Sequence, residues 1–82
     1  MAGVPRVART PPKHPALRRL GTQIRTVRLE RGFSQEALAD TAGIARSYMS
    51  GIERGVRNFS VLHLLKISRA LRVGVADLFV VK

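Results

Sequence analysis

Hydrogen-bonding side chains gather on one short segment of the chain, residues 45–54, and especially at its start. The polar side chains there are those of Arg46, Ser47, Tyr48 and Ser50. A guanidinium group can donate two hydrogen bonds at once to the O6 and N7 atoms of guanine. Serine hydroxyls can bond a base edge or a phosphate, and their small size allows close approach. The alternative is a polar helix face that simply meets solvent.

Other chemistry has little support in the sequence. The chain has no Cys, and His14 and His63 are far apart without further ligands around them, so we expect no disulfide and no metal site. We find no nucleophile–base–orienter set and no glycine-rich phosphate loop. We therefore expect no enzyme activity, no cofactor and no small-molecule ligand.

Length and charge narrow the class of protein further. The 82 residues are enough for one small domain with a thin core. Fifteen basic and five acidic residues give a net charge of +10, which is typical of proteins that bind polyanions, although a merely soluble basic protein gives the same count. Apolar runs fall far short of the ~20 residues that span a bilayer, and the N-terminus lacks the apolar core of a secretory signal. We expect a cytoplasmic protein with no membrane partner.

The segment 45–54 is expected to be the second of two short helices joined by a tight turn. Ser34 is placed to cap the first helix, 35–41, and Gly43 can adopt the left-handed conformation that reverses the chain. Small Ala39 lets the two helices cross closely. The apolar positions that can turn inward together are Leu38, Ala42, Ile44, Met49 and Ile52. This pattern predicts a helix-turn-helix, whose second helix enters a DNA major groove.

Helical periodicity also covers the flanking segments. Residues 15–31 carry an apolar stripe, start with Pro15 and end at Gly32; the stripe consists of Leu17, Leu20, Ile24 and Val27. Ser60 is expected to cap a helix ending near residue 71, with a buried stripe of Leu64, Ile67 and Leu71 widened by Val61, Leu65 and Ala70. A last short helix is expected at 75–79, and no strand. The predicted fold is an all-α, compact bundle of about five short helices with a central helix-turn-helix.

The stretch RSYMSGIER, residues 46–54, continuing into Arg57 and Asn58, resembles the lambda-repressor-like helix-turn-helix family. Within that family it is similar to the controller proteins of bacterial restriction–modification systems. The resemblance covers residues 17–79. It implies a sequence-specific transcription regulator that binds double-stranded DNA as a homodimer on a pseudo-palindromic operator. It also implies autoregulation of a restriction–modification system, with RNA polymerase as a candidate partner.

The resemblance assigns roles to individual residues. Base reading falls to Arg46, Ser47, Tyr48 and Ser50; Tyr48 could instead pack on the DNA backbone or bond a phosphate. Phosphate contacts fall to Gln35, Arg54, Arg57 and Asn58, with free N–H groups at the helix start assisting Gln35. For Arg54 and Arg57 the alternative is surface salt bridging. Arg28 and Glu53 are expected to form a structural pair that ties the first helix to the recognition helix.

Both ends of the chain carry expectations of their own. Residues 1–13 hold three of the four prolines and three positive charges, so we expect a flexible basic arm that follows DNA or remains an untethered tail. Residues 14–82 are expected to form the DNA-binding domain with a C-terminal dimerisation segment. The resemblance places the dimer interface at Val75, Leu78, Phe79 and Val80. The alternative is that this segment only closes the core.

Three positions depart from the expected pattern or allow two interpretations. Ala45 and Gly74 stand where family members usually have a capping residue. Gly51 has no side chain and is expected to permit close approach to DNA, at a cost of about 1 kcal/mol in helix propensity.

Two alternative functions remain open. One is a phage-type repressor or antitoxin with the same domain, and the other is a protein-interaction module that has lost DNA binding.

Overall fold

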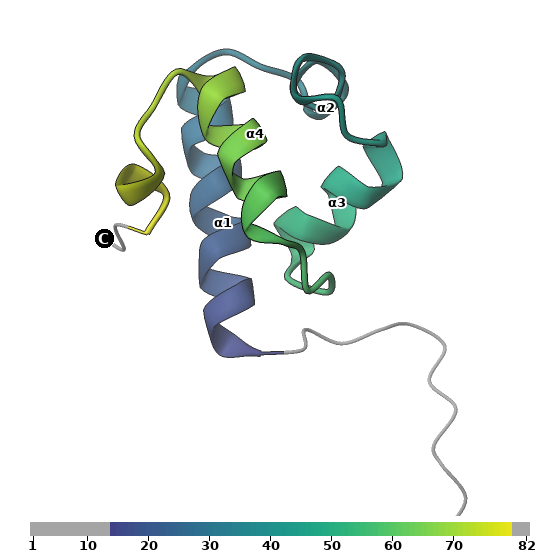
Figure 1. Ribbon diagram of the computed structural model, residues 1–82, viewed down its shortest axis with the longest axis vertical. Coiled ribbons are helices and arrows are strands. Elements are labelled where there is room, and N and C mark those ends of the chain that lie inside the picture. The colour runs from purple at the N-terminus through teal and green to yellow at the C-terminus, as the bar shows by residue number, and fades with distance from the viewer. Residues whose placement is uncertain (1–13, 80–82) are drawn as a thin grey trace, which may run out of the picture.

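The computed structural model describes residues 14–79 (Figure 1). Residues 1–13 and Val80, for which the sequence predicts the basic arm and part of the dimer interface, lie outside this range. The described elements are α1 (Pro15–Glu30), α2 (Gln35–Ala42), α3 (Arg46–Arg54), α4 (Val61–Leu71) and the 3-10 helix η1 (Val75–Leu78). Over residues 14–79 there is no strand. The all-α prediction is confirmed, and its five expected helices match these elements closely.

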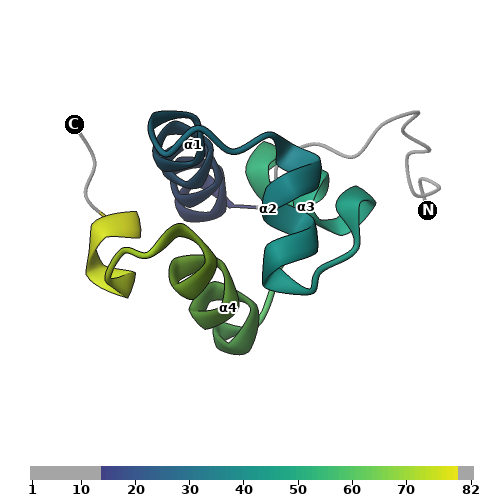
Figure 2. The same ribbon diagram turned by 90° about the horizontal axis from the view of Figure 1, so that it is seen from above.

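The helix-turn-helix lies on one side of the molecule and η1 on the other, with α1 and α4 between them (Figures 1 and 2). α1 packs against α3 and η1, whereas α2 packs against α3 and α4. α4 in turn contacts η1. The helix-turn-helix therefore packs against the two longer helices, α1 and α4, and α3 makes most of its contacts with α1.

One hydrophobic core joins all five elements. It consists of Ile24, Val27, Leu38, Ala39, Ala42, Ile44, Met49, Ile52, Leu64, Ile67, Leu71 and Leu78. The prediction that the apolar positions of α2, α3 and their turn face inward together is confirmed, because all of them are buried. Leu17 and Leu20, at the start of the α1 stripe, are only partly buried.

The buried face of α4 is narrower than the sequence predicted. Val61 is 72% exposed and Leu65 is 39% exposed, so these two residues do not widen the stripe. Ser68 is buried in their place, and its hydroxyl donates to the carbonyl oxygen of Leu65 at 3.0 Å. Because the serine satisfies its own hydroxyl within the helix, α4 can bury a polar residue at little cost.

Two predicted helix caps are confirmed and one was missed. The hydroxyls of Ser34 and Ser60 accept from the backbone N–H groups of Ala37 and His63, at 3.0 and 3.2 Å. The missed cap is His14, whose Nδ1 accepts from the N–H of Ala16 at 3.0 Å and starts α1. These bonds satisfy donors that every helix start leaves unpaired.

The two positions without a capping side chain behave differently. Ala45 makes no side-chain bond at the start of α3, as expected. At Gly74 the carboxylate of Asp77 accepts from the glycine N–H at 3.0 Å, so η1 is tied from its other end. The carboxylate of Asp77 thus supplies the capping bond that a glycine side chain cannot make at the start of η1.

A helix-interior glycine sets the distance between α1 and α3. A Cβ atom built on Gly21 would lie 2.4 Å from the carbonyl oxygen of Ile52 and 2.7 Å from that of Glu53. Gly55, which ends α3 with φ of 77°, likewise faces the backbone of Arg18. Only glycine fits at these points, so the end of α3 rests directly on the backbone of α1.

Candidate nucleic-acid interface

The first turn of α3 presents polar side chains to solvent. Arg46 and Ser47 are both exposed, and neither side chain has a hydrogen-bond partner within residues 14–79. The opposite face of the helix is fixed, because Met49 and Ile52 are fully buried. The core thus anchors α3 while the donors of Arg46 and Ser47 stay available to a ligand.

Tyr48 differs from its two neighbours because it is packed on its own protein. The side chain is partly buried against the core, and its ring centre lies 5.0 Å from that of His63 in α4. The guanidinium carbon of Arg57 lies over the same ring, 5.1 Å from its centre, which is a cation–π arrangement. The structure therefore links Tyr48 and Arg57, assigned to different kinds of DNA contact, into one cluster.

Gly51 makes room for Arg57 rather than for a ligand. The glycine is buried, and a Cβ atom at this position would lie 2.6 Å from Cγ of Arg57. The expectation that Gly51 permits close approach to DNA is therefore wrong. The stem of Arg57 covers Gly51 on its way to the ring of Tyr48.

Arg28 and Glu53 form a bidentate ion pair between α1 and α3. Nε of Arg28 lies 2.7 Å from Oε2 of Glu53, and its Nη2 donates to Oε1 at 3.1 Å. The third donor, Nη1, bonds the carbonyl oxygen of Phe33 at 2.9 Å. Both side chains are more than nine-tenths buried, so the pair is surrounded mainly by other protein atoms.

Gln35, the first residue of α2, extends this network. Its side-chain Nε2 donates to Oε1 of Glu53 at 3.0 Å. The amide group is partly buried, and the bond orients it at the N-terminus of α2. An amide held there by Glu53 can still direct its carbonyl oxygen or its second N–H outward.

A concave surface opens beside Gln35. This basic pocket has a volume of about 540 Å³ and is lined by Arg25, Arg28, Ser34, Gln35, Ser50, Glu53 and Arg54. Nε of Arg54 donates to Oγ of Ser50 at 3.3 Å, so these two predicted contact residues lie together. Arg25 lines the same pocket. It belongs to an arginine face of α1 for which the sequence allows either simple solvation or contact with phosphate. Asn58 is exposed in the loop after α3, outside the pocket.

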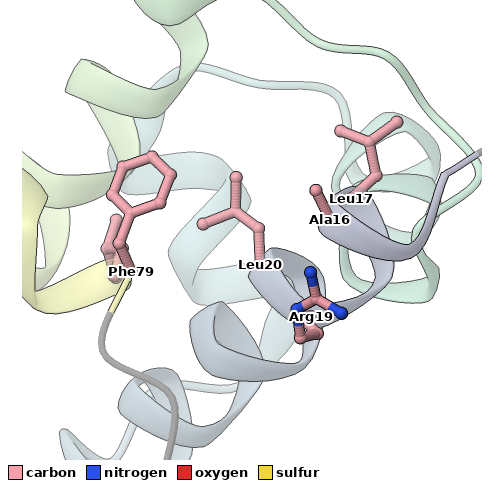
Figure 3. A pocket seen from close by; sticks show the side chains of 6 residues that line it. Ala16, Leu17, Arg19, Leu20 and Phe79 are labelled. Carbon is pink, nitrogen blue, oxygen red and sulfur yellow. The ribbon is translucent and has the colours of Figure 1, made fainter.

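The predicted dimer residues fall into different environments. Leu78 is 0% exposed and belongs to the core, because η1 turns it inward between α1 and α4, so it adds no exposed surface of its own. Phe79 is 57% exposed, and Val75 is partly buried. Phe79 borders an apolar pocket of about 290 Å³ formed with Ala16, Leu17, Arg19, Leu20 and Leu78 (Figure 3).

Residues 14–79 hold no group of three potential metal-ligating side chains. Within the same range no helix has the length and apolar character needed to cross a bilayer.

Two short helices are joined at the left-handed Gly43, with a buried ion pair behind them and exposed polar side chains on the first turn of the second helix. These features define a helix-turn-helix domain. The chain belongs to the helix-turn-helix family, whose model matches residues 24–78.

Comparison with individual proteins adds detail. The chain is 43% identical over 60 residues to the transcriptional regulator SinR of Bacillus subtilis, covering 72% of this chain but only 54% of SinR. It thus spans about half the length of this curated relative. It is 46% identical over 59 residues to the control protein C.BamHI of Bacillus amyloliquefaciens, covering 71% of this chain and 73% of that protein.

Solved structures agree with this assignment. The restriction–modification controller protein C.AhdI of Aeromonas hydrophila superposes with a TM-score of 0.79 at 41% identity, covering 80% of this chain and all of that one. SinR in complex with DNA superposes with a TM-score of 0.70 at 42% identity, covering 74% of this chain and 98% of that chain.

Proposed function

We propose that this protein is a sequence-specific DNA-binding transcriptional regulator that places α3 in the major groove. The observation that carries the proposal is the pair of exposed side chains, Arg46 and Ser47, which have no hydrogen-bond partner among residues 14–79 and lie on the first turn of a helix whose other face is buried. An arginine at this place can read guanine through two parallel hydrogen bonds. The solved complex of SinR with DNA supports the same use of the fold.

The basic pocket beside α2 is the proposed phosphate site. It combines the amide of Gln35 with Arg25 and Arg54 at the N-terminus of a helix, where free N–H groups favour an anion. Arg57 and Asn58 would contact DNA phosphates on the other side of α3. Such contacts set the position of α3 without reading sequence. The net charge of +10 adds a general attraction to DNA, to which the basic residues 1–13 would contribute.

We further propose that the protein acts as a homodimer joined through the apolar pocket. The exposed ring of Phe79 and the partly buried Leu17 and Leu20 form a surface on which a second copy could bury apolar area (Figure 3). Leu78 supports this surface from beneath. Two copies of α3 about 34–36 Å apart would then meet successive major grooves of a pseudo-palindromic operator.

Autoregulation of a restriction–modification system is the biological role that we propose. C.AhdI is named as a restriction–modification controller protein and C.BamHI as a control protein, and both match this chain over most of their length. The protein would act on DNA in the bacterial cytoplasm. The alternative is a repressor or antitoxin of the same fold, which a survey of neighbouring genes for an endonuclease distinguishes.

Contact with RNA polymerase is a further part of this proposal. Two of the five acidic residues, Glu36 and Asp40, are exposed one turn apart on α2, on a chain that is otherwise basic. An acidic face next to the DNA-binding helix could meet a basic polymerase surface. Run-off transcription with Glu36→Gln/Asp40→Asn tests this, because the double variant should keep DNA binding and lose activation.

Footprinting on the DNA upstream of the protein's own gene tests the main proposal. We expect protection of two half-sites whose centres are 10–10.5 base pairs apart, or a multiple of that distance. The protection should persist in an excess of random competitor DNA. Equal displacement by random competitor and by the upstream fragment would reject sequence-specific regulation.

A further inference from the structure

His63, which the sequence left without a role, is held in place by a single hydroxyl. Its backbone N–H donates to Oγ of Ser60 at 3.2 Å, and its ring Nδ1 lies 2.9 Å from the same atom. Because Ser60 is the N-cap of α4, its own position is fixed by the helix start. The imidazole ring is therefore oriented by the same hydroxyl that caps the helix.

The oriented ring of His63 packs against Tyr48. The two ring centres are 5.0 Å apart with an interplanar angle of 36°, which lies within the range of favourable aromatic pairs. Tyr48 is the third residue of α3 and directly follows Arg46 and Ser47. The contact thus runs from the start of α4 to the DNA-facing turn of α3.

We propose that His63 is a positioning residue for DNA recognition. Without touching DNA, it holds the ring of Tyr48 so that Tyr48 and the overlying Arg57 are already placed when DNA arrives. The inference rests on the proposed DNA-binding function of α3. Its physical basis is that a side chain ordered before binding does not lose that freedom on binding.

The ring type at position 63 is important for this role. An aliphatic residue could fill the space beside Tyr48, but it could not stack on the ring as an aromatic residue does. Both rings are partly exposed, and neither Tyr48 nor His63 is among the buried residues of the core. A purely structural role would therefore affect stability, whereas a positioning role affects Tyr48.

The chain offers a direct probe of this contact, because Tyr48 is its single tyrosine and it has no tryptophan. Tyrosine fluorescence of the free protein reports on Tyr48 alone. We expect His63→Ala to increase acrylamide quenching of this emission and to lower its anisotropy. His63→Phe should leave both near the wild-type values. Val61→Ala is the matched control, since Val61 is a 72% exposed residue of the same helix turn.

DNA binding is then measured with a duplex that the wild-type protein enriches from a random library, and with a random duplex of equal length. We expect His63→Ala to bind the enriched duplex about 2- to 12-fold more weakly, the cost of ordering one side chain on binding. His63→Phe should retain most of the affinity. In a Tyr48→Ala background, the His63→Ala change should not weaken DNA binding further. This double-mutant cycle isolates the part of the effect that passes through Tyr48.

The outcomes separate this inference from the function on which it rests. Wild-type affinity and fluorescence in His63→Ala would overturn the inference, as would an equal loss of affinity in the Tyr48→Ala background. In both cases the wild type still prefers the enriched duplex, so the proposed function stands. A wild type that enriches no duplex over random DNA would overturn both.

Discussion

The guanidinium group of Arg28 and the carboxylate of Glu53 meet at 2.7 and 3.1 Å across the boundary between α1 and α3. Glu53 also accepts from Gln35 of α2, so one carboxylate joins three helices. The side chain of Arg28 is satisfied in turn by Phe33. This network fixes α3 from behind, while its first turn faces outward with Arg46.

Glu53→Gln should strongly destabilise the domain. The change keeps the shape but leaves the buried guanidinium of Arg28 without a counter-charge, at an expected cost of about 3–5 kcal/mol. A domain of this size has a free energy of unfolding of roughly 4–12 kcal/mol, so the variant should be marginal. Urea denaturation measures the change. The double change Arg28→Met/Glu53→Met should destabilise the domain less than Arg28→Met or Glu53→Met alone, because no buried charge is left unpaired. A loss below 1 kcal/mol for Glu53→Gln would contradict this, since only an exposed ion pair contributes so little.

Gly21→Ala should also destabilise the domain, although it is a conservative change in a helix. The new methyl group would meet the carbonyl oxygen of Ile52 at 2.4 Å, so α1 and α3 must separate. We expect a loss of about 3 kcal/mol, at the upper end for overpacked positions. Thermal unfolding measures it, with Gly74→Ala as the control, since a Cβ there meets only Asp77 at 3.5 Å. Equal melting temperatures for the two variants would contradict the close approach.

The architecture could be predicted from sequence because its signals are local. The caps at Ser34 and Ser60, the reversing glycine Gly43 and the inward apolar positions of α2 and α3 each follow from neighbours within a few residues. The same holds for the free polar turn at Arg46. These features are fixed by backbone geometry and helical periodicity, and the structure places all of them as expected.

The features that sequence reasoning missed depend on contacts between distant segments. Gly21 reads as an ordinary weak point in a helix until Ile52 is placed against it. Arg25 lies ten residues before Gln35 in the chain, and only the fold shows that both residues line one pocket. Leu78 was assigned to the dimer interface because it lies in a run of apolar residues. The sequence of that run does not show which side chains η1 turns toward the core. No local pattern distinguishes these cases, because each depends on which helix face another element covers.

Gly51→Ala should separate stability from DNA binding. Alanine favours the helix by up to about 1 kcal/mol over glycine, which offsets the cost of moving the Arg57 side chain. The free energy of unfolding should therefore change little. The new Cβ must displace the stem of Arg57, which lies 2.6 Å away, and should pull its charge off the proposed phosphate contact. We expect weaker binding to all duplexes and a salt slope reduced by about 1. Arg57→Ala should show the same loss, and unchanged binding by Gly51→Ala would contradict the coupling.

Phe79→Ser should weaken the proposed dimer without unfolding the domain, because the ring is already 57% exposed. The dimer would lose the burial of two phenyl rings, each of which contributes about 1.5–3 kcal/mol to the free energy of association. The dissociation constant should therefore rise by a hundredfold or more. Sedimentation velocity over a concentration series measures this constant. Leu29→Ser removes a similarly exposed apolar side chain at the other end of α1 and should have no effect. If both variants associate like the wild type, the segment at Phe79 only covers the core.

Arg46 on α3 is the residue that we propose to read the DNA sequence. The most direct test of this role is the affinity of wild type and Arg46→Ala for the enriched duplex and for random DNA at several salt concentrations. We predict that Arg46→Ala loses about 1–3 kcal/mol, or roughly 5- to 150-fold, per half-site on the enriched duplex, with little loss on random DNA. Equal binding of both proteins to both duplexes, with one steep salt slope, would leave only counterion release and contradict the account.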